Sequence, residues 1–193
     1  VQALIVSPAA MATLAISPNI GVILSSPTAM ALIGPNNAAM ISFLDSSLAW
    51  GGLFSSSVAK GYIVASTGLV DSIASNSGLL TYLGTISVNN VAATGLPDGN
   101  ATSLQPFNAA TPLPTKLLTL SAKEVGIAAT FSNYNFGGSA IAGTQAGVTL
   151  SLSGTGNGGQ PVHIAAYTNM TWNFQGVGVT AATLPIITYV DMT

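Results

Sequence analysis

The chain has 193 residues, of which 49% are hydrophobic and only 4% are charged, with a formal net charge of -2 and no cysteine. Its 3 basic residues cannot form a phosphate-binding surface, so the composition excludes nucleic acid as a partner. The lack of cysteine excludes disulfides and thiolate metal sites. A length of this order fits one large domain.

The first 17 residues, VQALIVSPAAMATLAIS, contain no charge. Domain ends usually fray unless something holds them, and this segment lacks the charges that normally protect a sheet edge. We therefore expect residues 1–17 to be an extended N-terminal donor strand that completes the sheet of another subunit, and residues 18–193 to be the body. The residues expected at this subunit interface are Ala3, Leu4, Ile5, Val6, Met11, Leu14 and Ile16.

Helical signals are weak along the rest of the chain. The 21 glycines, 10 prolines and many β-branched residues disfavour helix. Pro8, Pro18, Pro27 and Pro35 interrupt every early apolar run well short of the roughly 20 residues that a membrane span needs. Only residues 67–80 are expected to contain a short helix, and no internal repeat of fixed period stands out.

Strand signals dominate the second half. Residues 116–123 and 147–154 alternate apolar and polar side chains with a period of two. Residues 162–180 and 185–193 are also typical of strands, and glycine-rich joints separate these segments. The pattern predicts an all-β fold, an immunoglobulin-like or jelly-roll-like β-sandwich.

The sequence offers little for catalysis. His163 is the only histidine, the 5 acidic residues are scattered, and no nucleotide-binding fingerprint is present. We therefore predict that the protein is not an enzyme, with no catalytic residue, no metal site and no cofactor. Aromatic residues in strands usually belong to a core, but Trp50, Trp172 and Tyr167 could form a carbohydrate platform.

Two glycosylation sequons begin at Asn100 and Asn169. A protein with so few surface charges gains hydration from N-glycans, so we expect an extracellular protein, secreted after signal-peptide cleavage. Asn100 lies in a predicted surface loop, and Asn169 lies in a predicted strand, where its side chain must point outward.

A charge-poor, cysteine-free β-domain with an apolar segment at residues 1–17 resembles the thread filament subunits of archaeal cell surfaces. Those subunits are similar in architecture to chaperone–usher pilins. The resemblance implies a secreted, glycosylated structural protein that polymerises head-to-tail with itself by donor-strand complementation, as a pilus-like filament for adhesion or biofilm. The alternatives are a viral capsid or surface-layer protein, and a secreted carbohydrate-binding or carbohydrate-active domain.

Overall fold

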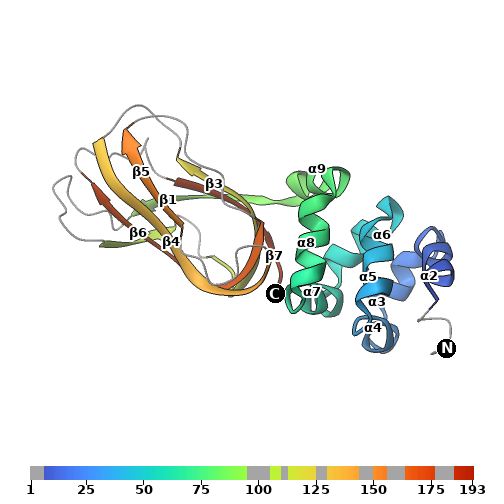
Figure 1. Cartoon of the computed structure of the whole chain (residues 1–193). Coiled ribbons are helices and arrows are strands. Elements are labelled where there is room, and N and C mark those ends of the chain that lie inside the picture. The colour runs from blue at the N-terminus through green and yellow to red at the C-terminus, as the bar shows by residue number, and fades with distance from the viewer. Residues whose placement is uncertain are drawn as a thin grey trace.

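The chain forms helices in its first half and strands in its second half (Figure 1). The computed structural model describes residues 7–94, 105–109, 113–124, 130–143, 150–155, 164–176 and 185–193. Within these, the helices are α2 (Pro8–Ala15), α3 (Ile20–Ser25), α4 (Pro27–Ile33), α5 (Asn37–Leu44), α6 (Ser47–Ser55), α7 (Ser57–Val64), α8 (Thr67–Ser75) and α9 (Ser77–Ile86).

The predicted all-β fold, an immunoglobulin-like or jelly-roll-like β-sandwich with an extended N-terminal donor strand, is therefore wrong. Eight helices occupy most of residues 8–86. The prolines of the early segment do not end apolar strands. Pro8 and Pro27 instead stand in the first turn of α2 and α4, where proline is well tolerated because that turn has no hydrogen-bonded N–H to lose.

The helices follow a ten-residue repeat. From α4 to α9, the residue that caps each helix N-terminus is Ser or Asn, and these caps are ten residues apart. Most of these side chains accept a hydrogen bond from the N–H three residues later, as Asn76 does from Leu79 at 2.9 Å. The caps are Ser26, Asn36, Ser46, Ser56, Ser66 and Asn76.

Two further positions of the repeat build the core. The seventh residue after each cap is buried throughout this series: Ile33, Phe43, Leu53, Ile63, Ile73 and Leu83. The third residue is also apolar, and from Ala39 onward it is buried in every repeat. These two positions lie one turn apart on the same side of each helix, so each repeat contributes one apolar side to a continuous core.

The repeats wind into a superhelix with three helices per turn. Helix α2 packs on α5, α3 on α6, α4 on α7 and α5 on α8, so each helix contacts the third helix after it. The first layer thus consists of α2, α3 and α4, and the second of α5, α6 and α7 (Figure 1). Helices α8 and α9 begin a third layer.

Hydrogen bonds connect residues about one superhelical turn apart. The Ser46 hydroxyl donates to the Ala15 carbonyl at 2.6 Å, and the Asn76 amide donates to the Leu44 carbonyl at 3.2 Å. Both bonds use a capping side chain to satisfy a carbonyl near the C-terminus of a helix in the layer before. The same polar residue type therefore starts a helix and holds two layers together.

In the described part of the chain, seven antiparallel strands follow the helices. They are β1 (Val88–Thr94), β2 (Gln105–Ala109), β3 (Lys116–Glu124), β4 (Thr130–Gly143), β5 (Leu150–Thr155), β6 (Ala165–Gly176) and β7 (Pro185–Asp191). Their order in the sheet is β2-β1-β7-β3-β6-β4-β5, with a further pairing of β2 with β6. The strands predicted at 116–123, 147–154, 162–180 and 185–193 are confirmed as β3, β5, β6 and β7, with shifted ends.

Strands β7, β3 and β6 are adjacent, and residues on both of their faces are buried. Leu118 pairs with Ala166 on β6 and with Val190 on β7, and all three belong to the same core cluster as the helices. Because side chains alternate along a strand, the neighbouring residues Leu117 and Tyr167 face the opposite side, and they too are buried. The helical stack therefore covers one face of this part of the sheet.

The sheet covers the C-terminal end of the stack. Helix α8 contacts β4 and α9 contacts β7, while the Lys60 ammonium on α7 donates to the Asp191 carbonyl at the end of β7, at 3.2 Å. Figure 1 shows α7, α8 and α9 beside this end of the sheet. Solenoids need such a cap because a terminal repeat otherwise exposes its apolar side.

The boundary predicted at residue 17 falls between α2 and α3. Both helices contribute to the core cluster, with Met11 and Ala15 from α2 and Ile20 and Leu24 from α3. Residues 8–15 are helical and pack within their own chain, so the extended conformation predicted for this segment is wrong there.

Candidate functional site

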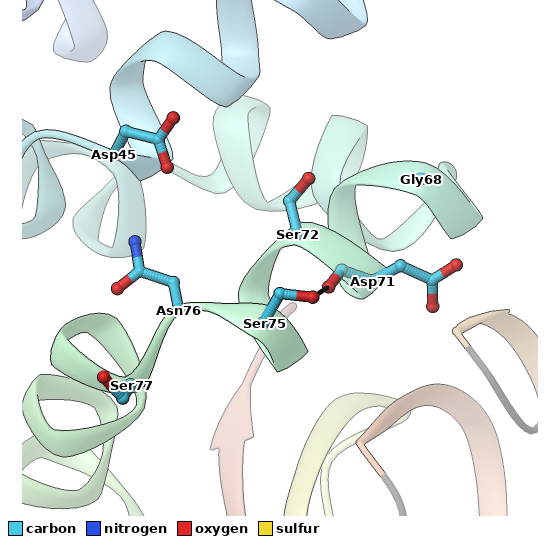
Figure 2. A pocket seen from close by; sticks show the side chains of 7 residues that line it. All are labelled: Asp45, Gly68, Asp71, Ser72, Ser75, Asn76 and Ser77. Carbon is cyan, nitrogen blue, oxygen red and sulfur yellow. Dashed lines mark hydrogen bonds between the residues drawn. The ribbon is translucent and has the colours of Figure 1, made fainter.

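A polar cleft lies between the second and third layers. It has a volume of about 510 Å³ and is lined by Asp45, Gly68, Asp71, Ser72, Ser75, Asn76 and Ser77. Asp45 follows α5, the next four residues belong to α8, and Asn76 caps α9. Figure 2 shows these side chains around the cleft.

The polar groups of this cleft mostly form hydrogen bonds with the backbone of the helices and do not gather around one shared centre. Asn76 accepts from the Leu79 N–H and donates to the Leu44 carbonyl, and the Ser75 hydroxyl donates to the Asp71 carbonyl at 2.9 Å. The Asp71 carboxylate points away from Asp45 in Figure 2. Its Oδ1 atom is buried and accepts no hydrogen bond from the described residues.

Such an arrangement does not match the acid and base of a glycosidase, because that chemistry needs two carboxyl groups facing one substrate. Among the described residues, no three His, Cys, Asp or Glu side chains gather closely enough to hold a metal ion. His163 lies outside the described residues. The prediction that the protein is not an enzyme stays a prediction.

The aromatic residues considered for a carbohydrate platform have other roles where they are described. The Trp50 indole N–H donates to the Leu44 carbonyl at 2.7 Å, and its ring lies 5.5 Å from the Tyr82 ring. Tyr167 is only 2% exposed on β6. Tyr167 therefore presents no exposed face to a sugar, Trp50 is only partly exposed, and nothing is described for the side chain of Trp172.

Burial raises the pKa of the Tyr167 hydroxyl above its ordinary value of 10.0. Between pH 10 and this raised pKa, the unfolded chain has lost the proton that the folded chain keeps. We therefore expect the contribution of Tyr167 to stability to be complete below pH 10 and to be lost as the pH rises further.

Urea unfolding at pH 9 to 11 measures this loss, which the Tyr167→Phe variant will not show. The Tyr62→Phe variant, which keeps Tyr167, will retain the wild-type pH dependence, and a parallel loss in all three proteins would contradict the assignment.

The apolar surface of the first layer is the second candidate site. Few of the large apolar side chains that the structure describes are exposed, and three of these belong to this layer: Ile16 is 64% exposed, Val22 is 73% and Leu32 is 48%. Ile16 follows α2, Val22 lies on α3 and Leu32 on α4. Contiguous apolar patches are typical of interaction surfaces, and these three side chains come from successive helices of one layer.

The predicted interface residues of the N-terminal segment divide between surface, interior and undescribed positions. Met11 is buried at 4% exposure and Leu14 is partly buried against the core, whereas Ile16 is exposed. Ala3, Leu4, Ile5 and Val6 lie outside the described residues. Val22 and Leu32 were missed by the sequence reasoning because they lie beyond residue 17, and the ten-residue repeat was the signal that could have found them.

Asn169 lies on an exposed bulge of β6. Its φ of 51° is in the left-handed region, which Asn tolerates better than most residues. The register between β4 and β6 shifts at this point, since Gly137 pairs with Thr171 and Ser139 with Thr168. The residue is exposed, as the sequon required. Its glycosylation stays a prediction, and Asn100 lies outside the described residues.

No protein-family model matches the chain, and no curated protein matches it either. Among the helices of the described residues, none combines the length and the apolar character that crossing a bilayer requires.

Proposed function

We propose that the protein is a structural subunit that assembles with copies of itself at the cell exterior, as a surface filament. The observation that carries this proposal is the exposure of a large apolar side chain on or directly after each of the helices α2, α3 and α4, namely Ile16, Val22 and Leu32. The polymer does not use an extended donor strand at residues 8–15, because those residues are helical.

The composition supports the same conclusion. With 4% charged residues and a net charge of -2, free subunits repel one another weakly. Contacts between them depend on apolar burial and backbone hydrogen bonds instead of ion pairs. Secretion and N-glycosylation at Asn100 and Asn169 belong to this proposal, since glycans would hydrate the surface that charges leave bare.

Assembly without ion pairs makes a specific prediction about salt. Sedimentation velocity of the full chain over a hundredfold range of concentration will show growth of large species. Sodium chloride will leave this growth unchanged, because there are few charges to screen, and sodium sulfate will strengthen it. Electron microscopy of the same samples will show filaments.

Three results would contradict the proposal in different ways. A monomer at every concentration would exclude self-assembly. Flat lattices instead of filaments would favour the surface-layer or capsid alternative. Assembly that weakens steeply with sodium chloride would show that charges hold the subunits together.

A further inference from the structure

We draw no further inference here: the strongest candidate, the polar cleft between the end of α5, helix α8 and the N-terminus of α9, combines a helix N-terminus with two aspartates, and the carboxylate of Asp71, which holds a buried oxygen without a hydrogen bond from the described residues, points away from Asp45 (Figure 2), so nothing in the described part of the chain shows what the cleft would bind.

Discussion

Replacing Leu118 with alanine will lower the free energy of unfolding by about 2–5 kcal/mol, the range found when a large buried side chain is removed from a core. Leu118 is fully buried on β3, and it faces the helices with Ala166 and Val190. Urea unfolding followed by circular dichroism measures the loss. Hydrogen exchange will also show faster exchange of the amides in α8 and α9, because the variant weakens the contact between the sheet and the stack.

Leu117→Ala is the matched control for this prediction. Leu117 is the same residue type, is also fully buried, and stands next to Leu118 on the opposite face of β3. The control will lose a similar amount of stability, but under native conditions its faster exchange will be confined to the strands. Equal effects of both variants on the α8 and α9 amides would show that the helices and the sheet do not share a core through Leu118.

Gly34→Ala will cost about 1–3 kcal/mol, as overpacking typically does. A Cβ atom at Gly34 would lie 2.1 Å from the nearest carbon of the Tyr62 ring, which is far inside van der Waals contact. Gly34 follows α4 in the first layer and Tyr62 belongs to α7 in the second, so the Tyr62 ring occupies the space that a side chain at Gly34 would need. Thermal and urea unfolding measure the effect.

Two further variants test the cause of this loss. Gly61→Ala, inside α7 with no atom within 4 Å of the added methyl group, will gain about 0.5–1 kcal/mol because alanine favours helix. In a Tyr62→Ala background, Gly34→Ala will cost little, and the double-mutant cycle will give a coupling of about 0.5–3 kcal/mol. A cycle with no coupling would mean that the layers do not meet at this glycine.

Strands were predictable where alternation of side chains was regular. The segment 116–123 alternates at Leu118, Thr119 and Leu120, and it became β3 within one residue of the predicted end. Tyr189 and Val190 are consecutive on β7 and so face opposite sides of the sheet, and both are buried because the sheet is covered on two sides here. The sequence could not show this double burial, since it depends on the helices that fold against the sheet.

The helices were missed because their pattern is short and carries no charge. A helix of eight or nine residues shows only two turns of periodicity, and the outward positions hold Ser, Thr, Gly and Ala instead of Lys and Glu. The connections between helices are only one to four residues long. Pro27 was therefore interpreted only as an interruption of an apolar run, whereas it starts a helix. The caps at ten-residue spacing were nevertheless visible in the sequence, and the statement that no fixed repeat is present was wrong.

The candidate site was predictable only in part. Apolar character at the N-terminus singled out Ile16, which is exposed, together with Met11, which is buried because it lies on the inner side of α2. To tell the exposed Ile16 from the buried Met11, one must know that residues 8–15 are helical. The period of two of a strand assigns these side chains to the wrong faces. Val22 became a candidate only after Ile20 and Leu24 fixed the inward side of α3.

The short connections and the three-helix turn fix the direction in which each successive helix lies around the axis of the stack. Duplicating a single ten-residue unit would swing everything beyond it through about a third of a revolution, because successive units are spaced around the axis in threes. Duplicating three units would add one full turn, so the sheet would keep its original orientation. The molecule would become longer by about 8–10 Å, the usual distance between packed helices. Homologues that differ in length by whole turns could therefore present the same two ends in the same orientation at different separations.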